Sequence, residues 1–399
     1  MKNKYKRSQF DIISKRLEEP RRFIQILFGP RQVGKTTLVE QVLETVKLPT
    51  IFASADAETR TDGLWVAQQW DRARLKSEQN PDQTVVLVLD EIQKITNWSE
   101  TVKKLWDEDS RENRSIQPIL LGSSSLLIQK GMSESLAGRF ELIRIPHWSF
   151  AEMNAAFGVS LDQYVFFGGY PGAADLLSDE PRWKTYVRDA LIEPAITKDV
   201  LLMTRIDKPA LLRQLFHLGA INSGKLISYT KLLGQLQDAG NTTTLAHYLD
   251  LLNTAGLLCG LQKFTADEIR TRASSPKFQV YNTALISAFS ADSFQAIRET
   301  PDRWGHFFES AVGAHLANQA FEHGLKLTYW RNGNHEVDFV LSQENRHIGI
   351  EVKSGRKRDA LVGMNHFVTQ FNPHRTLLVG TGGMPIQEFF KTPVSALFQ

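Results

Sequence analysis

The sequence predicts a multidomain α/β protein whose amino-terminal part contains a parallel β-sheet. Two short apolar runs, at residues 23–28 and 85–89, have the length and composition of strands buried on both faces. A glycine-rich loop and a helical segment follow the first run, and the second run ends in two carboxylates. Ligands of parallel sheets bind at the carboxyl ends of the strands, so we expect both features at one edge of the sheet.

The loop after the first run, residues 29–36 (GPRQVGKT), matches the phosphate-binding pattern G-x-x-x-x-G-K-[ST]. Its glycines let the backbone wrap around phosphate oxygens, and the start of a helix at residues 37–43 adds positive potential. Lys35 should reach the β- and γ-phosphates, and the Thr36 hydroxyl should bind Mg²⁺. The predicted nucleotide-binding residues are Gly29, Pro30, Arg31, Gln32, Val33, Gly34, Lys35, Thr36 and Thr37.

The second run is followed by Asp90 and Glu91, the arrangement called Walker B. We predict that Asp90 holds a magnesium ion, commonly through water, and that Glu91 orients and polarises the attacking water. The alternative is a chance loop followed by an ordinary buried strand that ends in acids. Because the two motifs support each other, the sequence predicts an enzyme that hydrolyses ATP with Mg²⁺.

Two further residues are candidates for catalysis. A strand at residues 117–122 leads to Ser123, in the position called sensor 1, where a hydroxyl reports the γ-phosphate; helix capping by a serine here is an equally good interpretation. Arg139 precedes a strand at residues 141–145 and is a candidate arginine finger, supplied within the chain or to a neighbouring subunit. The alternative for Arg139 is a surface ion pair.

These residues resemble the AAA-type (AAA+) ATPase module of a large prokaryotic group whose members carry a C-terminal domain of unknown function. The resemblance covers essentially the whole chain and continues in residues 167–172 (FGGYPG), which are similar to that group's Gly-Gly-Tyr-Pro signature. It implies ATP and Mg²⁺ as cofactors and a homo-oligomer, but no single biological role. The motifs that carry it are residues 29–38, residues 89–93, Leu121-Gly122-Ser123-Ser124-Ser125, Leu136-Ala137-Gly138-Arg139-Phe140 and Lys198-Asp199.

The chain divides into four predicted parts. Glycines and a proline at residues 168–172 break regular structure and mark the end of the first part. Helices at residues 228–236 and 242–254, followed by a strand from residue 256, have the pattern of a winged helix. The parts are an ATPase domain (1–165), a helical linker or lid (166–220), a winged-helix segment (221–280) and a C-terminal α/β domain (281–399).

The second helix of the winged-helix segment carries an unusual charge pattern for a DNA reader. Residues 241–258 contain no lysine or arginine, whereas Asp250 is acidic. Reading of base edges needs side chains such as arginine, so we favour a packing or assembly role, with DNA held by flanking residues as the alternative. The candidate phosphate contacts are Lys225, Lys231, Lys263, Arg270, Arg272 and Lys277.

The C-terminal part resembles the restriction-endonuclease-like PD-(D/E)xK fold. Asp338 lies in one predicted strand of a hairpin, and Glu351 and Lys353 lie in the other. In that fold the acids corresponding to Asp338 and Glu351 bind Mg²⁺, Lys353 positions or activates water, and Glu309 on a preceding helix completes the site. A half-buried strand pair with a simple ion pair is the alternative. Arg331, Arg356, Lys357 and Arg358 would form a basic rim.

Composition narrows the remaining possibilities. Cys259 is the only cysteine, none of the ten histidines has zinc-site spacing, and no apolar run approaches a membrane span, so we expect a cytoplasmic protein. The net charge of +3 does not by itself indicate nucleic acid. We expect an ATPase acting on nucleic acid, DNA before RNA. The alternatives are a nucleotide-dependent switch that binds a protein partner and an ATP-regulated metal-dependent nuclease.

Overall fold

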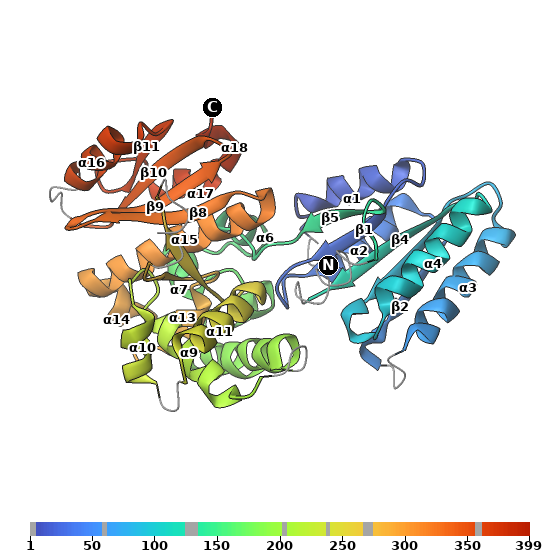
Figure 1. The fold of residues 1–399 in the computed structure, drawn as a ribbon, viewed down its shortest axis with the longest axis horizontal. Helices are drawn as coiled ribbons and strands as arrows, with labels where there is room; N and C mark the ends of the chain where they lie inside the picture. The colour runs from blue at the N-terminus through green and yellow to red at the C-terminus, as the bar shows by residue number, and fades with distance from the viewer. Residues whose placement is uncertain are drawn as a thin grey trace. The chain divides into compact units, whose positions relative to one another are not determined.

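The computed structural model describes residues 5–57, 62–123, 135–201, 206–236, 240–265, 274–355 and 361–399. The chain forms two compact units, residues 1–145 and residues 146–399. Figure 1 shows the first unit in blue to blue-green and the second from green to red. The chain therefore passes from one unit to the other once, between Ile145 and Pro146.

The first unit contains a parallel sheet in the order β2-β3-β4-β1-β5 within the described residues. Strands β1, β3 and β4 are buried along their whole length, as expected of apolar runs in a sheet covered on both faces. The prediction of a parallel sheet is confirmed. The strands are β1 (Ile24–Phe28), β2 (Thr50–Ser54), β3 (Val85–Asp90), β4 (Ile116–Gly122) and β5 (Phe140–Arg144).

Helices cover both faces of this sheet. Apolar side chains of α1 (Gln9–Glu18) and α2 (Lys35–Val46) form one core with alternate residues of β1, β3, β4 and β5. Helices α3 (Gly63–Gln79) and α4 (Trp98–Arg111) lie side by side on the other face (Figure 1), joined by a 2.6 Å hydrogen bond from Trp70 Nε1 to Asp109 Oδ2. Two short 3₁₀ turns, Ala55–Ala57 and Ile92–Lys94, follow β2 and β3.

The second unit is built on a mixed sheet in the order β11-β10-β9-β8-β6-β7, counting the described residues. The pairs β6–β8 and β10–β11 are parallel, and the other neighbours are antiparallel. The predicted hairpin is confirmed as the β9–β10 pair. The strands are β6 (Leu258–Lys263), β7 (Lys277–Val280), β8 (Lys326–Asn332), β9 (His335–Gln343), β10 (Arg346–Lys353) and β11 (Arg375–Gly380).

This sheet changes the predicted division of the C-terminal half. Strands β6 and β7 form the antiparallel pair expected of a wing, but Gln262 and Lys263 of β6 also pair in parallel with β8. Residues 221–280 and 281–399 therefore share one continuous sheet, because β6 satisfies backbone groups on both of its edges.

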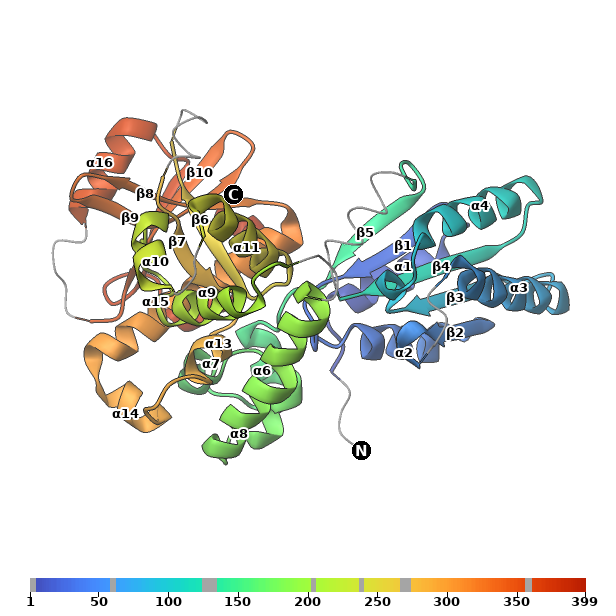
Figure 2. The same cartoon turned by 60° about the horizontal axis from the view of Figure 1, so that its bottom comes forward.

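Helices surround this sheet on both sides (Figure 2). The long helix α15 (Pro301–His323) is buried along most of its length and contacts β7, β8, β9 and β10, whereas α16 (Leu361–Phe371) places Met364 and Phe367 against β8 and β9. The other helices are α6 (Phe150–Phe157), α7 (Leu161–Phe167), α8 (Glu180–Tyr186), α9 (Pro209–Ile221), α10 (Tyr229–Gln235), α11 (Thr242–Thr254), α13 (Ala284–Ser287), α14 (Phe294–Glu299), α17 (Ile386–Lys391) and α18 (Val394–Leu397), with a 3₁₀ segment (Pro171–Leu176) and two π-helical segments (Val187–Ile192 and Ala195–Leu201).

The boundary between the units lies earlier than the predicted end of the ATPase domain at residue 165. Helices α6 and α7 belong to the second unit because their aromatic rings pack there. Phe150 and Tyr164 both contact Phe390 on α17, with ring centroids 6.1 and 5.8 Å apart. Aromatic packing of this kind contributes beyond the area it buries, so these helices are fixed to the C-terminal sheet layer.

The Gly-Gly-Tyr-Pro segment lies inside the second unit and has a packing role there. Gly168 has a φ of +70°, and a Cβ atom at this position would lie 1.8 Å from Asn282 Oδ1. That oxygen accepts hydrogen bonds from the backbone N–H groups of Gly169 and Ala284, both at 3.1 Å. The Asn282 Nδ2 atom lies 3.3 Å from His147 Nδ1. The glycines are therefore required where α7 packs against the turn after β7.

Candidate active site

The phosphate loop lies between β1 and α2 at the carboxyl edge of the first sheet. Gly29 packs so tightly that a Cβ atom would lie 1.9 Å from the carbonyl oxygen of Ile145. Gly34 has a φ of +86°, which favours glycine, and Gln32 also has a positive φ of 64°. The Lys35 ammonium donates to the carbonyl oxygens of Gly29 and Pro30 at 3.0 and 2.8 Å. The loop is thus a wrapped backbone with its lysine held inside the curve.

The Walker-B residues lie beside this loop. The Thr36 hydroxyl donates to Asp90 Oδ2 at 2.9 Å, so the two predicted metal ligands meet between the start of α2 and the end of β3. A hydroxyl and a carboxylate are the oxygen ligands with which proteins hold Mg²⁺ in nucleotide sites. Together with the glycine loop and Lys35, this pair fits a magnesium–nucleotide complex.

Glu91 is held in a polar network behind that pair. Gln93 Nε2 donates to Glu91 Oε2 and, at 3.1 Å, to Ser123 Oγ, which itself lies 3.4 Å from the same carboxylate oxygen. Arg31 Nη2 donates to Ser123 Oγ at 3.2 Å and lies 3.9 Å from Glu91 Oε2. The predicted water-activating and sensor residues are therefore brought together at the end of the phosphate loop.

Sequence reasoning missed two residues at this site. Gln93 joins Glu91 to Ser123, and its position two residues after the Walker-B glutamate was the signal that could have found it. Arg7 is buried, with 4% of its surface exposed, and donates to the carbonyl oxygen of Val33 in the loop at 3.3 Å. Nothing in the local sequence distinguishes Arg7 from its basic neighbours.

Arg139 lies at the opposite edge of the sheet from the phosphate loop. Its carbonyl accepts from the backbone N–H of Ile24, the first residue of β1, whereas the loop follows the last residue of that strand. The guanidinium donates to both carboxylate oxygens of Asp107, at 2.8 and 3.1 Å, which raises the pKa of Arg139 and lowers that of Asp107. A role at the phosphates of its own chain is incompatible with this position, so a role toward a neighbouring subunit stays the prediction.

Comparison with sequence families is consistent with this geometry. Residues 21–154 match the AAA domain family. With the parallel sheet and the phosphate loop, this match supports an AAA-type P-loop ATPase domain in the first unit. Residues 159–295 and 304–395 match two domains of unknown function, DUF8612 and DUF4143. Those descriptions name no fold, so the winged-helix and endonuclease-like resemblances stay predictions.

Two uncharacterized proteins, one from Mycobacterium tuberculosis and one from Methanocaldococcus jannaschii, are similar to most of this chain. The uncharacterized protein Rv2008c of Mycobacterium tuberculosis is 27% identical over 340 residues, which cover 83% of this chain and 70% of the relative. The uncharacterized protein MJ1544 of Methanocaldococcus jannaschii is 24% identical over 348 residues, covering 82% and 73%. Among solved structures, the RuvB Holliday junction branch migration motor of Thermotoga maritima matches with 16% identity and a TM-score of 0.33, over 63% of this chain and 85% of RuvB. A TM-score of this size carries no conclusion about function.

The second unit brings together the four residues of the predicted nuclease site around an additional lysine. Lys277 Nζ lies 2.9 Å from Glu309 Oε1 and 3.5 Å from Asp338 Oδ1. Lys353 Nζ lies 2.9 Å from Glu351 Oε1, and the backbone N–H of Val352 donates to Asp338 Oδ2 at 2.8 Å. We call Lys277, Glu309, Glu336, Asp338, Glu351 and Lys353 the carboxylate cluster.

Burial and neighbouring charge both act on the pKa values in this cluster. Burial, followed by repulsion from Asp338, raises the pKa of Glu351 to about 7, and its buried Oε2 atom has no hydrogen-bond partner. Burial also raises the pKa of Glu309, although Lys277 opposes this. Burial by itself would lower the pKa of Lys277, but Asp338, Glu309 and Glu336 outweigh it and the pKa is raised. Lys277 is therefore a charged ammonium in the interior.

Among the predicted phosphate contacts of the C-terminal half, one is buried and several lie outside the described residues. Lys277 is buried in the carboxylate cluster, so it is not available to a phosphate. On α11, the predicted apolar residues Leu245, Tyr248, Leu249 and Leu252 are buried. Arg270, Arg272, Arg356, Lys357, Arg358, Ser124 and Ser125 lie outside the described residues.

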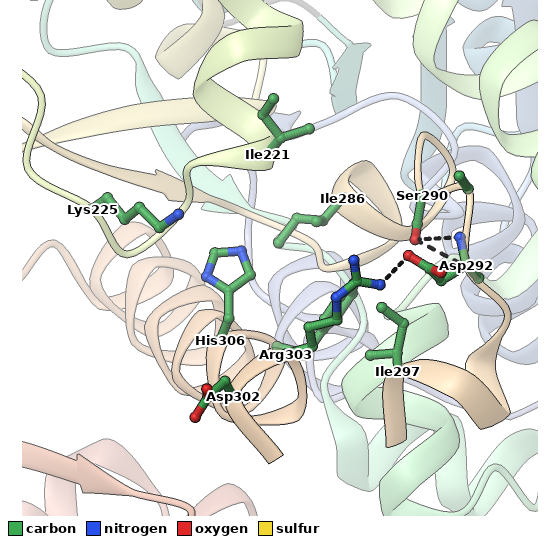
Figure 3. Close-up of a pocket in the computed structure, with 11 residues that line it drawn as sticks. Ile221, Lys225, Ile286, Ser290, Asp292, Ile297, Asp302, Arg303 and His306 are labelled. Carbon is green, nitrogen blue, oxygen red and sulfur yellow. Dashed lines mark hydrogen bonds and ion pairs between the residues drawn. The ribbon is translucent and has the colours of Figure 1, made fainter. Parts of the chain in front are cut away.

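A pocket of about 480 Å³ in the second unit contains one of the other candidate lysines. Figure 3 shows Lys225 and His306 on one side of it, and the Arg303–Asp292 ion pair on the other. Burial, and then the charge of Lys225, lower the pKa of His306 to about 4, so the ring is neutral at pH 7. Much of the remaining lining is apolar, and Ile286 projects into it (Figure 3).

Among the described residues, none of the helices combines the length and the apolar composition that a membrane span needs.

Proposed function

We propose that the first unit binds ATP with Mg²⁺ and hydrolyses it. The observation that carries this proposal is the 2.9 Å contact between Thr36 and Asp90, with Glu91 in the adjoining network. Backbone N–H groups of the loop and the Lys35 ammonium would bind the phosphates, and Thr36 and Asp90 would hold the metal. A bound Mg²⁺ would neutralise charge on the transferred phosphoryl group.

Glu91 and Ser123 have separate roles in this proposal. Glu91 would orient and polarise the attacking water, which requires its carboxylate to leave the hydrogen bond with Gln93 or to share it. Ser123 would register the γ-phosphate because its hydroxyl contacts both Arg31 and the carboxylate of Glu91. Arg139 would act on the nucleotide of a neighbouring copy in a homo-oligomer, after release from Asp107.

The test is phosphate release by the full chain with ATP, with and without Mg²⁺. Glu91→Gln should lower the rate by about 10²- to 10⁴-fold while nucleotide binding persists. Glu100→Gln is the matched control, because Glu100 is an exposed residue of α4 and should leave the rate unchanged. Hydrolysis at the normal rate in Glu91→Gln would overturn the proposal.

We further propose that the ATP cycle acts on nucleic acid, DNA before RNA, with a protein-binding switch as the second candidate. The switch is favoured by α11, whose sequence contains no lysine or arginine. Single- and double-stranded DNA and RNA, added separately to the same assay, distinguish the two. Stimulation by one of them supports the first candidate, and indifference to all of them supports the switch.

A further inference from the structure

The carboxylate cluster contains a cation of its own. Lys277 is on β7, at the edge of the six-stranded sheet, and only 1% of its side chain is exposed. Its ammonium lies 2.9 Å from Glu309, 3.5 Å from Asp338 and 3.8 Å from Glu336. It also donates to the backbone carbonyl of Asp338 at 3.2 Å and lies 4.7 Å from the centroid of the Phe339 ring.

Three of the carboxylate side chains in the cluster are partly exposed to solvent, whereas the lysine is not. The side chains of Glu309, Glu336 and Asp338 are 31%, 36% and 16% exposed. They come from α15 and β9, and the lysine approaches from β7 beneath them. A metal ion from solvent could therefore reach these oxygens, but it would meet the Lys277 ammonium at the same place.

A divalent ion and an ammonium compete for such a position. Magnesium requires oxygen ligands at about 2.0–2.1 Å in an octahedron, and a fixed positive charge among those ligands repels it strongly. Two further carboxylate oxygens are engaged, because Asp338 Oδ2 accepts from Val352 N–H and Glu351 Oε1 pairs with Lys353. Within the described residues, no three side chains of His, Cys, Asp or Glu converge as metal ligands do.

We propose that Lys277 takes the place of the divalent ion in the carboxylate cluster, so that this unit does not cut nucleic acid with a metal. The ammonium neutralises carboxylates of α15 and β9 and ties β7 to both, which is a structural role that a metal would otherwise serve. Glu351 Oε2 is buried and has no hydrogen-bond partner. If the cluster did bind a divalent ion, this oxygen would be the ligand atom open to it.

The test measures Mn²⁺ binding by electron paramagnetic resonance, using full chains that all carry Asp90→Asn to remove metal binding at the phosphate loop. Four such chains are compared. The parent carries Asp90→Asn alone, and the other three add Asp338→Asn, Lys277→Met, or both. We expect the parent and Asp338→Asn to bind Mn²⁺ equally. Lys277→Met should gain one bound Mn²⁺ per chain, and adding Asp338→Asn should remove it.

Two outcomes would overturn the proposal. One is Mn²⁺ binding by the parent chain that Asp338→Asn abolishes. The other is a folded Lys277→Met chain that gains no Mn²⁺. If Lys277→Met fails to fold, the comparison of the parent with Asp338→Asn still decides, and so does a cleavage assay on the otherwise unaltered chain. In that assay, single- and double-stranded DNA and RNA with Mg²⁺ or Mn²⁺ should show no cutting that depends on Asp338.

Discussion

Carboxylates gather in both units, at the end of β3 in the first and along α15, β9 and β10 in the second, but different groups face them. In the first unit, Asp90 faces the Thr36 hydroxyl, and the nearby Lys35 ammonium is turned toward the loop carbonyls. In the second, Asp338 faces the Lys277 ammonium directly. A hydroxyl beside a carboxylate leaves a place for a metal ion, whereas an ammonium fills it. In our proposals, the nearest cation, more than the acids themselves, is therefore what distinguishes a metal site from a structural one.

The largest expected effect is on the rate of ATP hydrolysis, which should depend on Asp90 but not on Asp338. Asp90→Asn should lower the rate of ATP hydrolysis on the order of 10³-fold, because it removes a charge that holds the metal at the phosphates. Asp338→Asn should leave that rate unchanged. Initial rates at saturating ATP and Mg²⁺ measure both. An equal loss in Asp338→Asn would mean that the two sites act together.

The next effect concerns stability. Lys277→Ala leaves the carboxylates of the cluster without their buried counter-charge and should lower the free energy of unfolding by about 3 kcal/mol. Lys326→Ala, at an exposed lysine of β8, is the control and should cost less than about 0.5 kcal/mol. Urea unfolding followed by tryptophan fluorescence measures both. Equal free energies of unfolding for the two variants would show that Lys277 does not stabilise the fold.

The units should also differ in their response to acid, because all ten histidines lie in the second unit. Burial against Phe389 and Phe390 lowers the pKa of His315 from 6.5 to about 4. The unfolded chain thus binds more protons than the folded chain between these values, and stability falls as pH drops from about 6.5 to about 4. Glu351 has the opposite effect on stability. Its pKa is raised from 4.5 to about 7, so the folded chain binds more protons than the unfolded chain between these values, and stability rises as pH drops through this range.

Replacing His315 separates its contribution to the pH dependence of stability from the contributions of the other titrating groups. Between pH 6.5 and 4, His315→Met should lose less unfolding free energy than the unaltered chain, by on the order of 2 kcal/mol. Urea unfolding at a series of pH values measures the difference. Parallel pH profiles for the two proteins would contradict the assignment.

The smallest effect concerns Arg139. Its pair with Asp107 is about one-third exposed on both sides, so Arg139→Gln should change the unfolding free energy by less than about 1 kcal/mol. If Arg139 serves a neighbouring copy, the same variant should lower hydrolysis per chain only at concentrations at which copies associate. A rate loss that does not depend on protein concentration would contradict this role.

The two sites also differ in how far the sequence predicts them. The phosphate loop and Asp90-Glu91 are local patterns, and the structure brings them together because parallel strands end at one edge. Likewise, the β9–β10 hairpin follows from alternation over neighbouring residues. Lys277 could not be recognised, because its partners Glu309 and Asp338 are distant in sequence and a lysine in a short strand carries no signal of burial.

The division into domains was harder to predict for a related reason. Breaks in regular structure, such as Gly168 and Gly169, look like linkers in sequence, yet here they allow close packing against Asn282. The pairing of β6 with β8 joins residues more than sixty positions apart. Local sequence patterns do not predict the register of strand pairing over such a separation.

The close packing of Gly29 against Ile145 connects the phosphate loop to the last residue of the first unit. Ile145 is also bound through its backbone N–H to the carbonyl of Phe28, and it is the last residue before the chain passes into the second unit. Because a Cβ atom at Gly29 would lie 1.9 Å from the Ile145 carbonyl oxygen, any larger residue at the first glycine of the loop would displace Ile145, the residue at which the chain leaves the first unit.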